Sequence, residues 1–456
     1  MPFPEMPLAL LYVASALREA GIGVDIVDTR IGDTIPMGPY LYAGITTNTG
    51  PQIKYALQAA GEIRRLMPGV PIVWGGVHPS LMPQQTLCNP FVDAVVVGEG
   101  ENAAVGFAHC GVDGICSGFN VDMDAIPIEL PYDLLRMDKY AFPCFAVHTS
   151  RGCPYRCGFC YNTAYNKRRW RGKSAGRVVD EIEYVVNRFG VRDIGFTEDE
   201  FCIDVDRVRA ICEGVLRRGL DITWASFCRV DTFERFTDAD LKLLERSGCI
   251  SLSFGCESGS QRILDEVIQK DATVEQMITA TERMSHTGIR QVVSFICGFP
   301  TETAQDMALT IALVEKLAAL NPQMYPNGVL MYTPYPGTPL FDRVVSEYGY
   351  KPPASLEAWA DFGIFRNVGA TPWHSKAYAR RCKAMSIATR FPFWHDFTCA
   401  EIRRLIGTTR FGRFPYSIAA VVLSKLARFR WKRQLWRFPI EWLVLERLLN
   451  KLRGYV

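Results

Sequence analysis

The stretch Arg151-Gly152-Cys153-Pro154-Tyr155-Arg156-Cys157-Gly158-Phe159-Cys160-Tyr161 decides how the rest of the chain is interpreted. Three cysteines fall within eight residues, with three and then two residues between them. Three thiolates at this spacing can bind three irons of one iron–sulfur cube, and the fourth iron then stays open for another ligand. A structural zinc site would need a fourth Cys or His nearby, and His148 lies upstream without the usual pairing. Chance clustering among the 15 cysteines is the other alternative.

This spacing resembles the Cys-x3-Cys-x2-Cys signature of the radical S-adenosylmethionine (radical SAM) enzymes, including the aromatic Phe159 before the last cysteine. The resemblance implies a 4Fe–4S cluster held by Cys153, Cys157 and Cys160. It also implies that the amino and carboxylate groups of SAM chelate the open iron. Reduction of the cluster would then cleave SAM to a 5′-deoxyadenosyl radical, so that the cofactor supplies the chemistry and the protein orients it.

Length, composition and charge indicate the number of domains, the kind of partner and the cellular location. A chain of 456 residues with 48% apolar content is long enough for two or three domains. Its net charge of +3 suggests no nucleic-acid partner. Fifteen cysteines without a secretory signal favour a reducing, cytoplasmic location. No apolar run approaches the roughly 20 residues of a membrane span.

Residues 1–105 alternate helical and strand patterns. Apolar residues from Leu8 to Leu17 have helical spacing, and a second helix is expected at 53–66. Strands are expected at 24–27, 41–47, 70–74 and 94–97. Apolar strands separated by helices predict a doubly wound, Rossmann-like parallel sheet, which binds ligands at glycine-rich strand ends. A linker at 106–140 is expected to follow.

This first region resembles the cobalamin-binding-like domain that precedes the barrel in one large radical SAM group. The matching stretches are residues 7–12, 25–28, 75–79 and 98–101, which make Gly75, Gly76 and Gly98 candidate cofactor contacts. The chain begins at the first helix, so the opening strand is expected to be missing. Because the segment 102–123 is short, fewer residues would cover cobalamin. No Asp-x-His-x-x-Gly occurs, so any cobalamin is expected to bind without a histidine ligand, and His78 is either a turn residue or a cofactor contact.

Residues 141–345 alternate more regularly. The expected strands are 145–149, 193–197, 222–227, 250–254, 291–296 and 328–332. Helices are expected between them at 178–189, 205–216, 239–246, 274–284 and 305–320. Six strand–helix units predict an open, partial TIM-like barrel, whose active site lies at the carboxyl ends of the strands.

The resemblance assigns cofactor contacts to these strand ends. Glu198 and Asp199 would hold the SAM amino group, and Arg229 would pair with its carboxylate. Glu257 and Ser258 lie in Gly-x-Glu-Ser-Gly and would meet the ribose or amino group, while the turn that begins at Gly298 would approach adenine. Each has a structural alternative, such as a helix cap or a surface ion pair. Cys256 and Cys297 are expected to be buried thiols, and no catalytic residue is predicted.

Residues 346–456 are expected to be helical. The segment 425–437 carries six basic residues interleaved with Phe429, Trp431 and Trp436. Packing on the barrel is the favoured interpretation, and docking on a membrane surface or an acidic partner is the alternative. A substrate lid is expected somewhere in this region.

The leading hypothesis is a radical SAM enzyme that acts on an unactivated C–H bond of a small molecule or lipid, with cobalamin-dependent methylation of carbon as the expected outcome. The alternative is a cobalamin-independent radical dehydration, cyclisation or rearrangement on the same barrel. A redox or scaffold protein is disfavoured because an electron carrier needs no SAM pocket. A methylthiotransferase is disfavoured because its extra cysteine trio and RNA-binding domain are absent. The expected partners are the substrate and an electron donor such as flavodoxin or ferredoxin.

Overall fold

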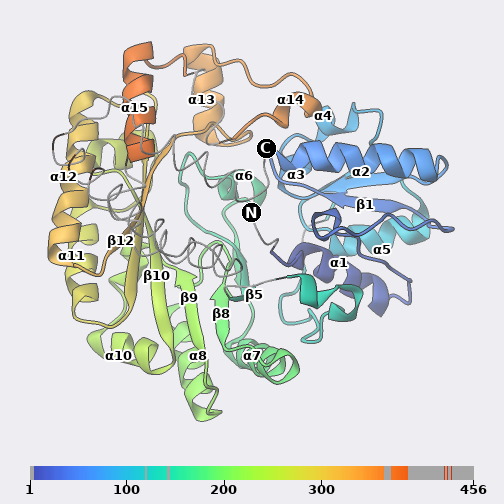
Figure 1. Ribbon diagram of the computed structural model, residues 1–456, viewed down its shortest axis with the longest axis horizontal. Coiled ribbons are helices and arrows are strands. Elements are labelled where there is room, and N and C mark those ends of the chain that lie inside the picture. Colours follow the sequence, from blue (N-terminus) through green and yellow to red (C-terminus); the bar gives the residue numbers. More distant parts are fainter. Residues whose placement is uncertain are drawn as a thin grey trace, which may run out of the picture.

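The computed structural model describes residues 5–118, 121–140, 144–363 and 371–388, together with Leu426, Phe429 and Arg433. Two parallel sheets organise these residues and lie beside one another (Figure 1). The first sheet has the order β1-β2-β3-β4, and the second has the order β12-β11-β10-β9-β8-β5. The expected α/β class, with a Rossmann-like first domain and a six-stranded partial barrel, is confirmed.

The first domain is a parallel sheet with helices on both faces. The sheet consists of β1 (Ala43–Thr46), β2 (Ile72–Gly75), β3 (Ala94–Val97) and β4 (Gly114–Ser117). Helix α2 (Gln52–Leu66) covers one face with the short α3 (Val77–Leu81) and α4 (Pro83–Leu87), while α1 (Leu8–Glu19) and α5 (Glu101–Cys110) pack together on the other (Figure 1). Helices α1 and α2 and the strands at 43–46, 72–75 and 94–97 agree with the sequence prediction, whereas α3, α4 and α5 are not predicted by it.

Two expectations about this sheet differ from the structure. Residues 24–27 form no strand, so that prediction is wrong. In the flavodoxin-like strand order 2-1-3-4-5, the segment after the first helix pairs with a strand that precedes this helix, and the described residues before α1 contain no such strand. Without that neighbour, the apolar segment has no ladder to join. In addition, β4 was not predicted, and it extends the sheet into the segment that was expected to be a linker.

Residues 121–140 connect the two sheets and are tied to both. The 3-10 turns η2 (Tyr132–Leu134) and η3 (Met137–Lys139) are the regular elements here, after η1 (Thr29–Ile31) in the first domain. The Tyr140 hydroxyl donates to Asp28 at 2.9 Å, and the Ser174 backbone N–H donates to Asp124 at 2.8 Å. The connector therefore fixes the first domain against the barrel.

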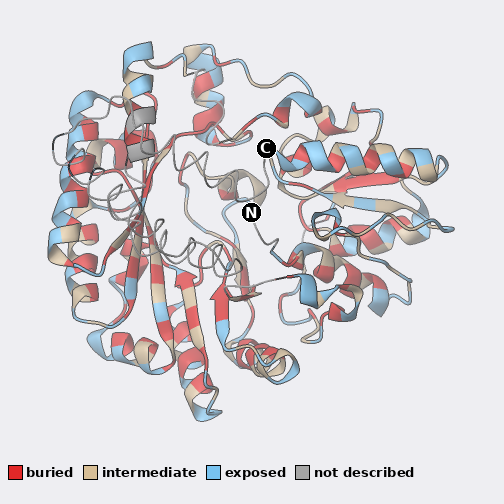
Figure 2. Ribbon diagram, viewed as in Figure 1, coloured by how far each residue is buried: buried red, intermediate tan, exposed pale blue. Residues whose placement is uncertain are grey.

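The barrel is built from six parallel strands, and all six agree with the predicted positions. They are β5 (Phe145–Val147), β8 (Asp193–Phe196), β9 (Thr223–Phe227), β10 (Cys249–Glu257), β11 (Arg290–Cys297) and β12 (Tyr325–Met331). The covering helices are α7 (Ala175–Phe189), α8 (Val205–Arg217), α9 (Val230–Phe233), α10 (Asp238–Arg246), α11 (Val274–Ser285) and α12 (Ala304–Leu320). Buried residues concentrate where these helices meet the strands (Figure 2).

Smaller elements surround the carboxyl ends of the strands. A two-stranded antiparallel hairpin, β6 (Ser150–Gly152) with β7 (Trp170–Gly172), brackets the cysteine loop and α6 (Asn162–Tyr165). A π-helical turn, η4 (Ile263–Val267), follows β10. After β12 come α13 (Pro339–Tyr348), α14 (Leu356–Trp359) and α15 (Lys376–Ala388), and α15 lies against β12. Most of the predicted basic segment 425–437 lies outside the described residues.

Within the described part of the chain, no helix is both long and apolar enough to cross a bilayer.

Candidate active site

The cysteine loop is held in shape from three sides. Asp199, directly after β8, accepts hydrogen bonds from the Tyr161 hydroxyl at 2.7 Å and from the Gly152 backbone N–H at 3.2 Å, so it joins both ends of the loop. Inside the loop, the Gly158 N–H donates to the Ile268 carbonyl at 2.7 Å. The Gly158 carbonyl in turn accepts from the Leu340 N–H at 2.8 Å. The loop therefore has a fixed backbone before any cofactor binds.

The three loop thiols fit a cluster better than a single ion. Among the described residues, Glu200, Cys202 and Cys228 are the one trio whose ligand atoms all lie within 4.8 Å of one another. At least two of the sulfurs of Cys153, Cys157 and Cys160 therefore lie farther apart than this, which is compatible with binding to different irons of one cluster. Burial raises the pKa of Cys153 to about 11 and that of Cys160 to about 12, so metal binding must displace protons from these thiols.

Buried charges surround Cys157. Arg229, at the end of β9, donates from Nη1 to Cys157 Sγ at 3.4 Å and from Nε to Asp231 at 2.9 Å. Lys270 lies next to it, with Nζ 3.1 Å from an oxygen of Glu257. Glu257 ends β10 with a φ of 63°, a left-handed conformation that is rare outside glycine and is often found at functional sites. Sequence reasoning found Arg229 and Glu257 but missed Lys270.

Glu198 presents a free carboxyl oxygen to the site. Thr149 donates to Glu198 Oε1 at 2.5 Å, whereas the buried Oε2 atom has no hydrogen-bond partner. Burial raises the pKa of Glu198 to about 7 and that of Glu200 to about 8. A buried carboxyl oxygen without a partner is costly unless a ligand completes its bonding, so this atom suits a donor such as an ammonium group.

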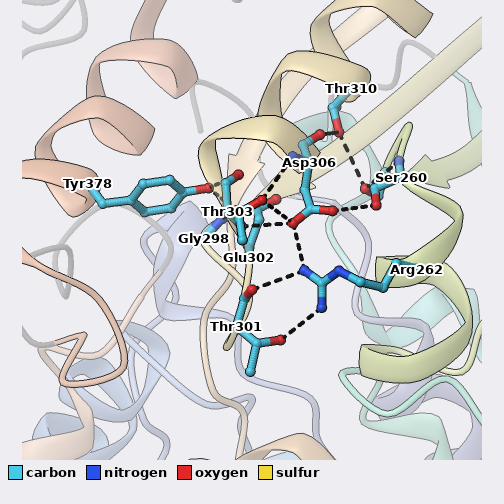
Figure 3. A network of polar contacts seen from close by, with 10 residues as sticks. Ser260, Arg262, Gly298, Thr301, Glu302, Thr303, Asp306, Thr310 and Tyr378 are labelled. Atoms are coloured by element: carbon cyan, nitrogen blue, oxygen red, sulfur yellow. Dashed lines mark hydrogen bonds and ion pairs between the residues drawn. The ribbon is translucent and has the colours of Figure 1, made fainter.

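The turn after β11 is supported by a polar network around Asp306 (Figure 3). Asp306 accepts from Ser260 at 2.6 Å and from Arg262 at 2.6 Å, and it forms a capping box with Thr303. Arg262 also donates to the Thr301 carbonyl at 3.0 Å. Although burial acts in the opposite direction, these donors hold the pKa of Asp306 below its usual range. The network thus joins the loop after β10 to the turn that begins at Gly298.

Phe159 and Ser258 complete the set of predicted contacts. The Phe159 ring lies 6.0 Å from that of Phe299, which places it against the Gly298 turn. The Ser258 hydroxyl accepts from the Ser260 N–H at 3.1 Å and lies 3.3 Å from Thr310 Oγ1, so it faces α12. Cys256 and Cys297 are buried, as expected.

A cavity of about 320 Å³ lies between the two domains. From the first domain it is lined by strand ends that include Gly75, Gly76 and Gly98, and from the barrel by Glu198 and Asp199. A Cβ added at Gly75 would meet only Val96 at 3.8 Å, so this floor borders open space. Among the described lining residues, the histidine is His148 of the barrel. His78 instead packs against Trp359, with ring centroids 5.4 Å apart.

Ion pairs close the seam beside this cavity. Arg151 of the hairpin contacts Glu99 at 3.1 Å and Glu101 at 2.6 Å, and Arg171 also pairs with Glu99. Both carboxylates belong to the first domain and are at most 9% exposed. The hairpin that carries the cysteine loop is therefore attached directly to the ligand-side edge of the first sheet.

The fold and the site define a class of enzyme: a partial barrel with a three-cysteine loop, whose strand ends share a cavity with a Rossmann-like domain. Residues 147–314 match the family model of the radical SAM superfamily, and residues 2–108 match the B12 binding domain. The chain is 33% identical over 371 residues to an uncharacterised methyltransferase of Pyrococcus horikoshii, which covers 75% of this chain and 78% of that protein. The chain therefore belongs to the radical SAM superfamily, in the group with an N-terminal B12-binding domain. Its cofactors are those of this group: a 4Fe–4S cluster, SAM and cobalamin.

Other similarities are more distant. The anaerobic magnesium-protoporphyrin IX monomethyl ester cyclase of Rubrivivax gelatinosus is 30% identical over 330 residues, which are 63% of this chain and 55% of that protein. The cobalamin-dependent SAM radical enzyme OxsB, with aqua-cobalamin and SAM bound, superposes with a TM-score of 0.73 at 18% identity and covers 99% of this chain and 73% of its own. The methyltransferase TsrM from Kitasatospora setae has a TM-score of 0.60 at 20% identity over 77% and 74% of the two chains. These superpositions establish a shared fold.

Proposed function

We propose that this protein is a cobalamin-dependent radical SAM methyltransferase that methylates an unactivated carbon of a small molecule or lipid. The observation that carries the proposal is the shared cavity, because the glycine-lined strand ends of the first domain and the acidic strand end of the barrel open into the same space. A methyl group carried on one cofactor must reach a carbon activated by the other, so both sites have to face one substrate.

The chain's own residues have separable roles in this proposal. Cys153, Cys157 and Cys160 hold the cluster, and Asp199 keeps both ends of their loop in place. The free oxygen of Glu198 accepts from the amino group of SAM, and Glu257 binds its ribose or amino group. When bound, the cluster and SAM supply a 5′-deoxyadenosyl radical that abstracts hydrogen, and cobalamin carries the methyl group. Cys157, Glu198 and Glu257 are buried, so water has little access to these side chains.

Gly75, Gly76 and Gly98 allow the backbone of the first domain to approach the corrin ring closely. Gly76 and Gly98 have φ values of 96° and 94°, a region that side chains disfavour. We infer that cobalamin would be held here without a histidine ligand from the first domain, because no histidine of the described first domain lines the cavity. Three further parts of the proposal concern partners and location. The electron donor is of the flavodoxin or ferredoxin type, and the protein works in the cytoplasm. A peripheral membrane contact would form through the tail at 425–437.

The second candidate function is a radical cyclisation without cobalamin; the observation in its favour is that one relative of 30% identity is named a cyclase. One experiment distinguishes the two. Anaerobically reconstituted protein is given SAM, a one-electron reductant and a set of small-molecule and lipid acceptors, with and without cobalamin, and products are quantified by mass spectrometry. Methyl transfer produces S-adenosylhomocysteine together with 5′-deoxyadenosine, and only when cobalamin is present. Formation of 5′-deoxyadenosine alone, at equal rates with and without cobalamin, would favour the cyclisation instead.

A further inference from the structure

Arg229 already has a partner for each part of its guanidinium group. Nη1 points at Cys157 Sγ at 3.4 Å, Nε pairs with Asp231 at 2.9 Å, and Nη2 donates to the Lys270 carbonyl. The guanidinium carbon also lies 3.5 Å from the centroid of the Tyr155 ring. A bidentate bond to the carboxylate of SAM would have to break several of these contacts. The geometry therefore directs the charge of Arg229 toward a cluster ligand.

Lys270 adds a second buried positive charge next to Arg229, whose Nη2 donates to the Lys270 carbonyl, and its Nζ lies 3.1 Å from Glu257 Oε1. It is 4% exposed, and its flanking residues Gln269 and Asp271 have φ values of 50° and 55°. Two left-handed residues that are not glycine cost free energy, and such strain persists where the surroundings impose it. The buried ion pair with the Glu257 carboxylate keeps the Lys270 ammonium charged in this interior.

Gly255 makes room for this arrangement. A Cβ at this position would lie 2.3 Å from Glu257 Oε1 and 3.4 Å from Lys270 Nζ. Because Gly255 has no side chain, β10 leaves space for the buried pair of Lys270 and Glu257. Arg156 offers a contrast, because it precedes Cys157 in sequence but is 53% exposed and pairs with Asp271 on the surface.

Buried and exposed charges affect a cluster differently. The reduction potential of an iron–sulfur cluster depends on the net charge around it and on hydrogen bonds to its sulfurs. A positive charge in a low-dielectric interior stabilises an added electron much more than one that water screens. Arg229 and Lys270 are buried charges in such an interior. Arg156 is an exposed charge that water screens.

We propose that Arg229 and Lys270 are positioning residues that raise the reduction potential of the cluster through Cys157, so that a one-electron donor can reduce it. This inference rests on the proposed function, in which Cys157 is a cluster ligand. In the step concerned, one electron passes from the flavodoxin- or ferredoxin-type donor to the oxidised cluster. No bond forms or breaks at Arg229 or Lys270, and both keep their protons.

The test is the midpoint potential of the reconstituted cluster, followed by electron paramagnetic resonance without SAM. Arg229→Gln and Lys270→Met should each lower the potential, so that the ratio of reduced to oxidised cluster at a fixed solution potential falls about tenfold, which is 59 mV for one electron. Glu257→Gln should raise the potential, because it removes the negative charge that opposes Lys270. The control Arg156→Gln should leave it unchanged.

Iron and sulfide contents, measured on the same samples, separate the possible outcomes. An unchanged potential in Lys270→Met with a full cluster would overturn the inference, and so would an equal shift in Arg156→Gln. Loss of the cluster from both Arg229→Gln and Lys270→Met would also overturn it, because these residues would then only hold the loop. If the unaltered protein formed no cluster, the proposed function itself would fail. A correct potential without methyl transfer would contradict only the methylation.

Discussion

Thr301 occupies a position where its side chain is a disadvantage. In the turn Gly298-Phe299-Pro300-Thr301-Glu302-Thr303, Thr301 has a φ of 62°, in the left-handed region that favours glycine. Left-handed backbone costs a β-branched residue roughly 1–2 kcal/mol, part of which glycine would lose again as conformational entropy. Thr301→Gly should therefore raise the free energy of unfolding by about 0.5–1 kcal/mol.

Thermal unfolding of the cluster-free protein measures this change. Thr303, two residues later, is the matched control, because it caps α12 through Asp306 and has an ordinary φ of −104°. Thr303→Ala should cost about 1 kcal/mol, the usual loss for a helix cap. A lower melting temperature for Thr301→Gly would show that the bonds from Arg262 determine the energy of this turn.

Glu302 should make stability depend on pH. Burial raises its pKa to about 7 from an ordinary value of 4.5, and one of its oxygens lacks a partner. The folded state therefore holds an extra proton between these values, and its stability falls as the pH rises through this window. Between pH 5 and pH 8 the free energy of unfolding should therefore fall by up to about 3 kcal/mol, at about 1.4 kcal/mol per pKa unit. Glu302→Gln should abolish this fall.

Melting temperatures at these two pH values provide the measurement. The exposed substitution Glu282→Gln serves as the control and should reproduce the profile of the unaltered protein. An identical decline in Glu302→Gln would assign the pH dependence to other groups, such as Glu198 and Glu200.

At the scale of single residues, the sequence identified candidate site residues that stand in motifs, and it missed Lys270, which a loop brings into the site. The cysteines and Glu198 stand in recognisable spacings at strand ends. Lys270 belongs to no motif, and a lone lysine in a polar loop is normally exposed. Its burial follows from the path of residues 263–271 over the barrel, which no local pattern specifies.

At the scale of elements, β10 supplies the next prediction. Gly255→Ala should displace the Glu257 carboxylate, because the new Cβ would lie 2.3 Å from Glu257 Oε1. We expect SAM affinity to fall at least about tenfold, or ~1.4 kcal/mol, with little change in cluster content. Equilibrium dialysis of SAM against reconstituted protein measures the loss. Equal loss of cluster and of SAM binding would instead make Gly255 a residue of the fold.

Whether a segment forms a strand depends on the neighbours with which it can pair, and its own sequence does not show these neighbours. The barrel strands alternate regularly with amphipathic helices, so their apolar runs located all six, including β5 with three residues and β8 with four. Residues 24–27 have a similar apolar pattern, but no described segment lies beside them to pair with, which the pattern cannot reveal. The opposite error occurred at β4, where Gly114-Ile115-Cys116-Ser117 is short and alternately exposed, and pairing with β3 makes it a strand.

At the scale of the whole molecule, the two domains are joined by charge. Glu99→Ala would leave Arg171 and part of Arg151 without a counterion in a largely buried seam. We expect a loss of about 2 kcal/mol, below the usual value for a fully buried pair because Arg171 is 32% exposed. The exposed pair of Arg18 and Asp133 also spans domain and connector, and Asp133→Ala should cost under about 1 kcal/mol.

Chemical denaturation followed by domain-specific limited proteolysis measures both variants. Earlier cleavage between the domains in Glu99→Ala than in Asp133→Ala supports the seam as the main junction. Equal effects would transfer that role to the connector at 121–140.

The central claim is that the loop of Cys153, Cys157 and Cys160 and the glycine-lined strand ends are two separate cofactor sites that open into one cavity. Its most direct test is the cofactor content of the variant in which all three cysteines are alanine, reconstituted without oxygen next to the unaltered protein. We expect the variant to lose its iron, its sulfide and all SAM cleavage, while it still binds cobalamin with unchanged affinity. A variant with its full iron and sulfide content would contradict the assignment of this loop as the cluster site.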